Sequence, residues 1–319
     1  MRIFCLALLL LPGASSAIVI ANYTDDANLR FHSDPAFIGN PYDWSGVGRT
    51  SVSADNSVNK EWATLLGENY FISAVHYHPS TGDTITFRGS NLISSPTFNY
   101  TVAGGFSVPG TDLWIGYTAG AMSPTLKRYA FNTTSADNLS ETGLVGSTLL
   151  INGDNVAAGP GTITDSLVGT NQAEAWIEGG STTIDSTPST VDILTTPINF
   201  DTFILWENHA ADTANNVTAH EALVQSGDSG SPAFQIVGGN LEIAGIAYSV
   251  FTGSGIAGDF DSATSGDEPR LGSVYSYTGS YETPINNTIA LVPLAVPESG
   301  TLSLLALASL GLMRRRALN

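Results

Sequence analysis

Cysteine is almost absent from this sequence of 319 residues, in which Cys5 is the only one. A disulfide within the chain is therefore excluded, because it needs two cysteines. A zinc site built from several cysteines is excluded for the same reason. The stability of the folded protein must come from burial, and a chain of this length can enclose a sizeable core.

Charged residues are also scarce, at 13% of the sequence, and most of them are acidic. Eleven lysines and arginines stand against 29 aspartates and glutamates, which gives a formal net charge of −18. Such a surface repels phosphate backbones, so we expect no nucleic acid among the partners. We interpret the acidity as serving solubility, and a preference for basic substrates is the alternative interpretation. The hydrophobic fraction of 42% separates the chain from disordered proteins.

Long segments with a helical period are missing. Short apolar or alternating runs are instead separated by Gly, Asn, Asp, Ser and Pro, which predicts an all-β barrel or sandwich. The expected strands are 62–66, 70–75, 84–87, 98–102, 113–117, 149–152, 173–177, 203–206, 233–237 and 241–250. Residues 237–240 predict a hairpin turn, residues 179–196 predict a surface loop, and residues 22–42 fit no element clearly.

The first residues have the order of a secretory signal peptide. Arg2 precedes an apolar run over 3–11, and Ser15 and Ala17 are the small residues before a cut. The apolar run is too short to span a bilayer, which takes about 20 residues. We expect cleavage after Ala17 and export from the cell, with cleavage after Ala21 or an uncleaved anchor as alternatives.

The last residues join Pro297-Glu298, an uncharged segment over 299–313 and three arginines at 314–316. This order resembles the PEP-CTERM sorting tail of Gram-negative bacteria, although Ser299 stands where the family has proline. Basic residues after an apolar helix hold that end in the cytoplasm. The resemblance implies an exosortase-like sorting enzyme as a partner and membrane contact only through this tail. A plain tail anchor is the alternative.

We therefore expect three parts, which are a signal peptide over 1–17, a working domain over 18–293 and a sorting tail over 294–319. The expected location is extracellular or at the cell surface, with transient anchoring in the inner membrane by residues 299–313.

The strongest chemical signal is Gly227-Asp228-Ser229-Gly230-Ser231-Pro232. A serine hydroxyl needs an adjacent base to act as a nucleophile, and N–H donors must face the oxygen that becomes negative. A glycine at 227 allows the N–H groups of Gly227 and Ser229 to converge. The alternative is a plain Gly/Ser turn before a strand. An α/β-hydrolase elbow fits poorly, because the second glycine comes one position early.

This segment resembles the nucleophile motif of chymotrypsin-like serine proteases of the trypsin superfamily, and 244–247 fits the strand that follows the motif in that family. The family also has a histidine after an early strand, matched by 71–77, and an aspartate that opens a later strand, matched by 111–117. The resemblance implies His76 as the base, Asp112 as the carboxylate that orients it and Ser229 as the nucleophile. The N–H groups of Gly227 and Ser229 would then form the oxyanion hole.

The resemblance also implies two six-stranded antiparallel β-barrels with the active site between them and a boundary near residues 120–145. The long segment between Asp112 and Ser229 implies an insertion. The family builds its substrate pocket from residues that correspond here to Leu223, Val224, Tyr248, Ser249 and Val250. No acidic residue lies at the base of that pocket, so a small apolar side chain is expected. Protein or peptide would be the substrate.

Several alternatives stay open at this stage. His76 and Asp112 could be structural, and the competing residues are His32, His78, His209, His220 and Asp83. The family activates some members by pairing an Ile-Val terminus with the aspartate before the serine, here Ile18 and Asp228. We expect no cofactor and no metal, although acidic residues over 259–268 leave calcium as an alternative. The competing function is an inactive protease-like fold that serves as a surface adhesin or matrix protein.

Overall fold

The computed structural model describes residues 18–32, 35–52, 61–132, 144, 146–154, 166–181, 183–186, 189–192, 198–206, 219–253 and 270–293. These residues are almost entirely strands and turns, which confirms the predicted all-β class. The expected signal peptide, the sorting tail and the acidic 259–268 segment lie outside them. Among the helices in these ranges, none has both the length and the apolar character to cross a membrane.

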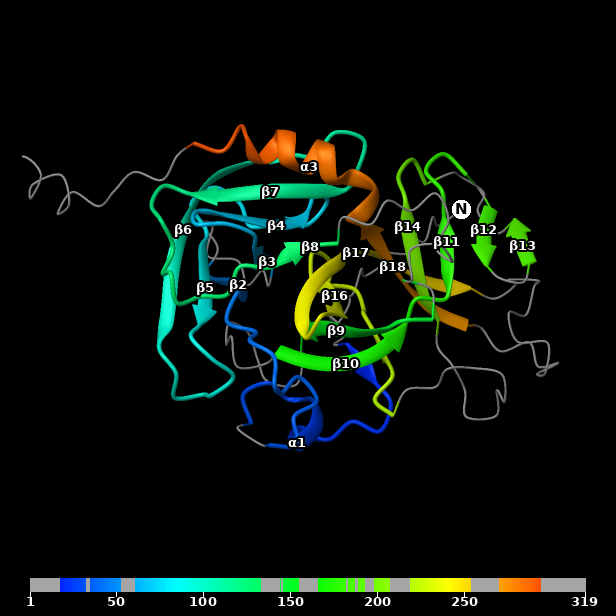
Figure 1. Cartoon of the computed structure of the whole chain (residues 1–319), viewed down its shortest axis with the longest axis horizontal. Helices are drawn as coiled ribbons and strands as arrows, with labels where there is room; N and C mark the ends of the chain where they lie inside the picture. Colours follow the sequence, from blue (N-terminus) through cyan, green and yellow to red (C-terminus); the bar gives the residue numbers. More distant parts are fainter. Residues whose placement is uncertain are drawn as a thin grey trace, which may run out of the picture.

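Six antiparallel strands close into a barrel in the first half of the chain, on the left in Figure 1. The strands, in chain order, are β2 (Val47–Val52), β3 (Trp62–Leu65), β4 (Tyr70–Ala74), β5 (Thr84–Arg88), β6 (Thr97–Ser107) and β7 (Leu113–Thr118). Around the barrel they run β2-β3-β4-β7-β6-β5, and β5 pairs with β2 to close it. Phe71, Phe87 and Trp114 fill its interior. The first expected barrel is therefore present.

The second half forms a ten-stranded sheet in the order β10-β9-β16-β17-β18-β14-β11-β12-β13, with β8 beside β17. The bounds are β8 (Ala130–Phe131), β9 (Thr148–Asp154), β10 (Ser166–Gln172), β11 (Ala175–Ile177), β12 (Thr183–Ser186), β13 (Ser189–Asp192), β14 (Thr202–Trp206), β16 (Pro232–Val237), β17 (Asn240–Gly253) and β18 (Arg270–Tyr277). The sheet curls on itself. Strand β10, at one end of the order, contacts β14, and the Glu174 N–H donates to the Ile204 carbonyl over 3.0 Å.

This curled sheet has more strands than the six expected for a second barrel. Strands β11, β12 and β13 extend it beyond β14, and β12 and β13 lie in the 179–196 segment that we expected to be a loop. Its serines and threonines suggested a loop, but β-branched residues such as Ile184 and Val191 favour strands. The predicted hairpin at 237–240 is confirmed, since Val237 pairs with Asn240.

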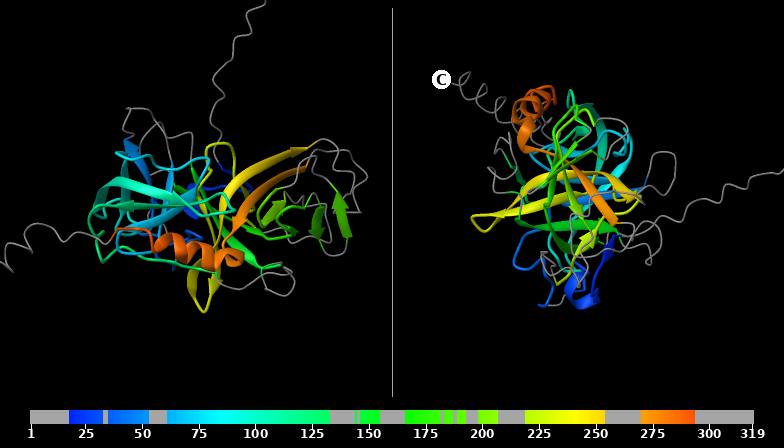
Figure 2. Two further views of the ribbon diagram at one scale, coloured as in Figure 1. Left: turned by 90° about the horizontal axis from the view of Figure 1, so that it is seen from above. Right: turned by 90° about the vertical axis from the view of Figure 1, so that its right-hand side faces the viewer.

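The helices are short and follow from local signals. Helix α1 (Asp25–Asn28) lies in the 22–42 region and is capped by the Thr24 hydroxyl, which accepts the Ala27 N–H over 3.1 Å. Helix α3 (Glu282–Ile289) follows the short 3-10 turn η3 (Gly279–Tyr281) after the last strand. It crosses back to the first barrel and lies against β7 (Figures 1 and 2).

One apolar cluster joins the two halves. Ile72 and Ile115 of the first barrel share it with Phe234 and Ile246 of the second sheet, and the buried Ile285 of α3 completes it. The ends of β4 and β7 are thereby fixed beside β16 and β17, and this junction is where the candidate site lies. At the other side of the sheet, β1 (Val19–Ile20) pairs with β15 (Ala222–Leu223).

Candidate active site

His76 and Asp112 come from neighbouring strands of the first barrel. Strands β4 and β7 are antiparallel with Ala74 opposite Leu113, so the residue that follows β4 by two positions meets the residue that precedes β7. The Asp112 carboxylate accepts the His76 backbone N–H at Oδ1 over 3.2 Å. Its Oδ2 lies 2.6 Å from His76 Nδ1. The carboxylate therefore holds both the backbone and the ring of His76.

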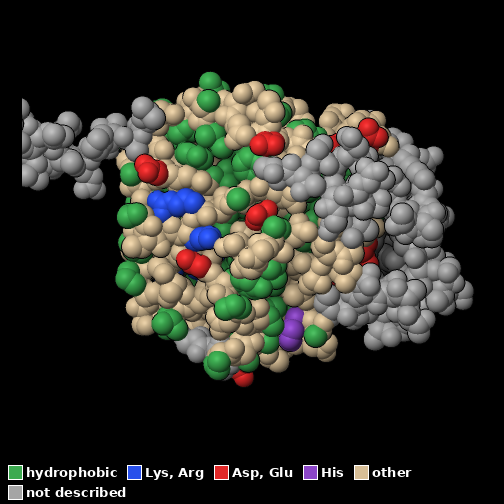
Figure 3. Space-filling model, in the orientation of Figure 1, with side chains coloured by type: hydrophobic (Ala, Val, Ile, Leu, Met, Phe, Trp, Pro, Cys, Tyr) green, Lys and Arg blue, Asp and Glu red, His purple; other side chains and the backbone are tan. Residues whose placement is uncertain are grey.

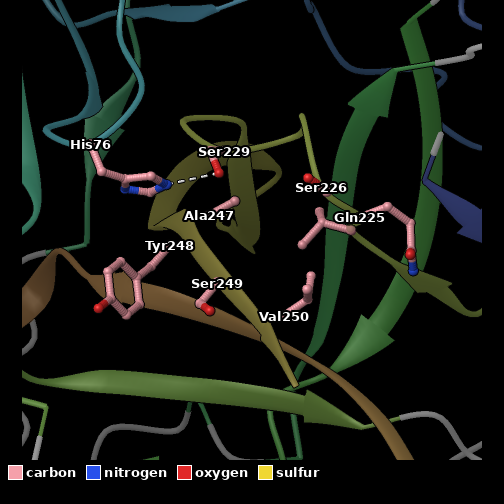
Figure 4. A pocket seen from close by; sticks show the side chains of 9 residues that line it. His76, Gln225, Ser226, Ser229, Ala247, Tyr248, Ser249 and Val250 are labelled. Atoms are coloured by element: carbon pink, nitrogen blue, oxygen red, sulfur yellow. Dashed lines mark hydrogen bonds between the residues drawn. The ribbon is translucent and has the colours of Figure 1, made fainter. Parts of the chain in front are cut away.

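The geometry fixes the tautomer of His76. An ionised carboxylate only accepts hydrogen bonds, so the proton of the neutral imidazole lies on Nδ1. The lone pair of Nε2 is then directed at Ser229, whose Oγ lies 2.8 Å away (Figure 4). The His76 side chain is 39% exposed and that of Asp112 only 9%, so the ring is open to a substrate while the carboxylate is shielded.

Ser229 lies in the loop over 224–231, between β15 and β16. Two backbone hydrogen bonds fasten this loop to β17. The Gly230 N–H donates to the Ala247 carbonyl over 3.0 Å, and the Ala247 N–H donates to the Ser231 carbonyl over 2.9 Å. The structure thus brings His76, Asp112 and Ser229 together from segments far apart in the sequence.

Gly230 is the point where this loop touches the histidine segment. A Cβ at this position would lie 2.7 Å from Ser73 Oγ and 3.2 Å from the Tyr77 carbonyl oxygen. The residue also has a φ of +85°, which disfavours any side chain. A glycine here lets the two halves approach closely enough for the serine hydroxyl to reach the imidazole.

The two N–H groups expected to form an oxyanion hole are available in the structure. Gly227 has a φ of +103°, which a glycine adopts without strain. Within the described ranges, neither the Gly227 N–H nor the Ser229 N–H donates to an acceptor. Their role as oxyanion donors remains a prediction.

Asp228 is fully buried beside Ser229 and holds the loop from within. Its Oδ2 accepts the Gln225 N–H over 2.9 Å, and its Oδ1 accepts the Asp154 N–H over 2.8 Å. Burial raises its pKa to about 7, against the lowering effect of these hydrogen bonds and of Arg49. In the uncleaved chain the Ile18 N–H donates to the Asp154 backbone carbonyl over 3.2 Å. The pairing of a free Ile18 terminus with the Asp228 carboxylate stays an open alternative.

A cavity of about 280 Å³ opens next to Ser229. Apart from His76 and Ser229, its lining residues are Val224, Gln225, Ser226, Ala247, Tyr248, Ser249 and Val250. Figure 4 shows Ala247 to Val250 along one strand and Gln225 and Ser226 on the facing loop. Four of the five expected pocket residues line this cavity. Sequence reasoning missed Ala247 as well as Gln225 and Ser226, although the place of the last two just before the serine motif pointed to them.

Leu223 is the exception and must be corrected. It is only 4% exposed, pairs with Val19 across β1 and β15, and packs in the core of the second sheet. Leu223 is the last residue of β15 and does not line the cavity, whereas the next residue, Val224, does.

Tyr248 covers one side of the His76 ring. The two rings meet edge to face with centroids 5.6 Å apart, and Phe200 packs against Tyr248 with centroids 4.9 Å apart. Burial and the nearby negative charge of Asp112 raise the pKa of Tyr248. Sequence reasoning missed Phe200, which lies in a segment with no recognisable motif.

The competing residues have other partners. His78 stacks on Trp114 at 4.0 Å between centroids, His32 pairs with Asp26 at 2.9 Å, and Asp83 accepts the Ser80 N–H at 2.7 Å. The backbone carbonyl of His220 accepts the Thr170 N–H over 2.8 Å, and His209 lies outside the described residues. Among the described ones, His32, His78, His220 and Asp83, none has a hydrogen bond to Ser229.

Charged side chains are sparse around the fold. The face in Figure 3 shows a few basic groups over the first barrel and scattered acidic ones. In the part of the chain that the structure describes, no three His, Cys, Asp or Glu side chains gather to hold a metal ion. The acidic 259–268 segment, considered for calcium, lies outside that part.

Comparisons with known proteins were made for sequence and for structure. No family model matches the chain, and no curated protein matches its sequence. Among solved structures, Rv3671c from M. tuberculosis H37Rv, as a serine-to-alanine mutant in an inactive form, aligns with a TM-score of 0.44 and 15% identity over 82% of this chain and 97% of that one. The inactive form of the Rv3671c protease aligns with a TM-score of 0.43 and 15% identity over 81% and 95%.

Proposed function

We propose that this chain is a serine endopeptidase that hydrolyses peptide bonds through an acyl-enzyme intermediate. One observation carries the proposal, which is the hydrogen-bonded series from Asp112 through His76 to Ser229, with distances of 2.6 and 2.8 Å. A carboxylate, an imidazole and a hydroxyl in this order make up the machinery of acyl transfer. No cofactor is part of the proposal.

The proposed reaction begins when Ser229 Oγ attacks the carbonyl carbon of the scissile peptide bond. His76 Nε2 takes the hydroxyl proton, and Asp112 stabilises the imidazolium that forms. The N–H groups of Gly227 and Ser229 donate to the oxygen that becomes negative. The imidazolium then gives its proton to the leaving amine, and the peptide bond breaks. Water repeats these steps on the acyl-serine and releases the acid.

The test of this proposal is reaction of the folded protein with a fluorophosphonate. We expect one covalent adduct per chain on the peptide that contains Ser229, because only a serine beside a base is nucleophilic enough to react. The same protein unfolded in denaturant is the control and should remain unlabelled. A folded protein that does not react would contradict the proposal and favour the inactive protease-like fold acting as an adhesin or matrix protein.

The cavity beside Ser229 leads to a prediction about substrates. Its described lining has neither Asp nor Glu, and small or aliphatic side chains such as Val224, Ala247 and Val250 dominate it. We expect peptides with Ala or Val before the cleaved bond to be hydrolysed at least about tenfold faster in kcat/KM than peptides with Arg or Lys, because a buried cation would have no partner. Matched peptides that differ only at this residue measure the ratio, and a preference for Arg or Lys would contradict it.

Export and surface anchoring form a separate part of the proposal. They rest on the expected signal peptide over 1–17 and the PEP-CTERM-like tail over 294–319. An exosortase-like enzyme would cut near that tail. The intact mass of the protein recovered from outside the cell tests both cuts, and a mass that includes residues 1–17 would contradict the first.

A further inference from the structure

A buried ion pair connects the two halves of the molecule behind the site. Arg49 extends from β2 of the first barrel, and its Nη1 contacts Oδ1 of Asp154 at the end of β9. The two side chains are only 2% and 7% exposed. The Arg49 guanidinium also lies 5.7 Å from the ring of Trp62. Either charge alone would be costly in the interior, so the two side chains must stay in contact.

The backbone of the same aspartate, Asp154, is hydrogen-bonded to the loop that carries Ser229. The Asp154 N–H donates to Asp228 Oδ1 over 2.8 Å, while the other oxygen of Asp228 accepts the Gln225 N–H over 2.9 Å. The Asp228 backbone completes a tight turn, since its N–H donates to the Gln225 carbonyl over 3.0 Å and its carbonyl accepts the Ser231 N–H over 2.9 Å. Asp228 thus joins both ends of the 224–231 loop to the backbone of β9.

We propose that Arg49 and Asp154 are positioning residues, which hold the 224–231 loop through Asp228 in the conformation that presents Ser229. The pair fixes where the Asp154 N–H lies, and that N–H fixes the Asp228 carboxylate. The loop that depends on this carboxylate includes Gly227 and Ser229, whose N–H groups would receive the oxyanion. The effect on catalysis rests on the proposed function, whereas the effect on the conformation of the loop does not.

The charges around Asp228 predict the direction in which its pKa changes when Arg49 is replaced. Arg49 lowers the pKa of Asp228, whereas burial and the negative charge of Asp154 raise it, and the net pKa is about 7. Burial raises the pKa of the Tyr275 hydroxyl, and the negative charge of Asp228 raises it further. Without Arg49, a positive charge that lowers the pKa of Asp228 is lost, so Asp228 ionises only at higher pH. The carboxylate then accepts its two N–H bonds less strongly at neutral pH.

Hydrogen exchange measured by mass spectrometry tests the proposal without any substrate. In Arg49→Met we expect peptides over 148–154 and 222–231 to exchange on the order of tenfold faster or more, while β7 keeps its protection. Arg30→Met is the matched control, because Arg30 is equally buried but donates to Asn91 and to the Val47 carbonyl. Equal acceleration in both variants, or none in Arg49→Met, would overturn the proposal.

A milder pair of variants keeps the test decisive if Arg49→Met does not fold. Arg49→Lys retains the charge but loses the forked geometry, so it should accelerate exchange of the same two segments severalfold, with Arg30→Lys as its control. An unchanged pattern in Arg49→Lys would count against the proposal.

Kinetics of the folded Arg49→Lys variant give the second readout. We expect kcat to fall several-fold with KM within about twofold, because the change misplaces the reacting groups rather than the bound peptide. If the wild-type chain hydrolyses nothing, the proposed function fails, whereas the exchange experiment still decides the role of Arg49. If the wild-type chain is active and Arg49→Lys matches it in kcat, the positioning role fails alone.

Discussion

Replacing Ser229 with alanine should lower kcat for peptide hydrolysis by on the order of 10⁶-fold, and His76→Ala should cost about as much. The hydroxyl supplies the attacking oxygen, and the imidazole 2.8 Å from it removes its proton. Each group is ineffective without the other. Steady-state kinetics on one peptide, with enzyme concentrations high enough to measure the residual rate, provide both values.

The double variant sharpens this prediction. Because the two groups act as a unit, Ser229→Ala together with His76→Ala should be no slower than either single variant within about tenfold. Two independent contributions would instead multiply. His78→Ala is the matched control, since His78 stacks on Trp114 two positions away and should leave kcat unchanged. Substantial activity in Ser229→Ala would mean that another residue is the nucleophile.

Much of the fold could be predicted from the sequence, because strands and turns are marked by local patterns of apolar and turn-forming residues. The apolar runs over 70–75 and 113–117 identified β4 and β7, and the glycines at 238 and 239 identified a hairpin. Their pairing could not be predicted this way, since the contact between Ala74 and Leu113 joins distant segments. A resemblance in three short motifs supplied that missing step for His76, Asp112 and Ser229.

Features that depend on the tertiary environment were harder to predict. Arg49 and Asp154 have no sequence neighbours that mark them as partners, and their burial only becomes visible once β2 and β9 face each other. Phe200 likewise reaches Tyr248 from a segment without a pattern. Leu223 was misassigned because a motif match does not show which of two adjacent residues lines the cavity. In the candidate site, the errors concern side chains whose role is set by distant contacts.

The change Asp112→Asn should lower kcat by about 10⁴-fold, less than the loss of Ser229. Asp112 accepts two hydrogen bonds, from the His76 N–H at 3.2 Å and from Nδ1 at 2.6 Å. An asparagine has a single oxygen. If that oxygen keeps the backbone N–H, the amide NH₂ faces Nδ1, and the imidazole proton must move to Nε2.

That tautomer is the wrong one for catalysis, because a protonated Nε2 cannot take the proton of Ser229. The fold should persist, and ¹⁵N chemical shifts of His76 should report the change of tautomer directly. Asp83→Asn is the matched control, as it changes a buried carboxylate of the same barrel that accepts the Ser80 N–H in a turn. If Asp112→Asn stays within tenfold of the wild type while Nδ1 remains protonated, the carboxylate does not act by orienting the ring. The ring would then be held by its packing against Tyr248.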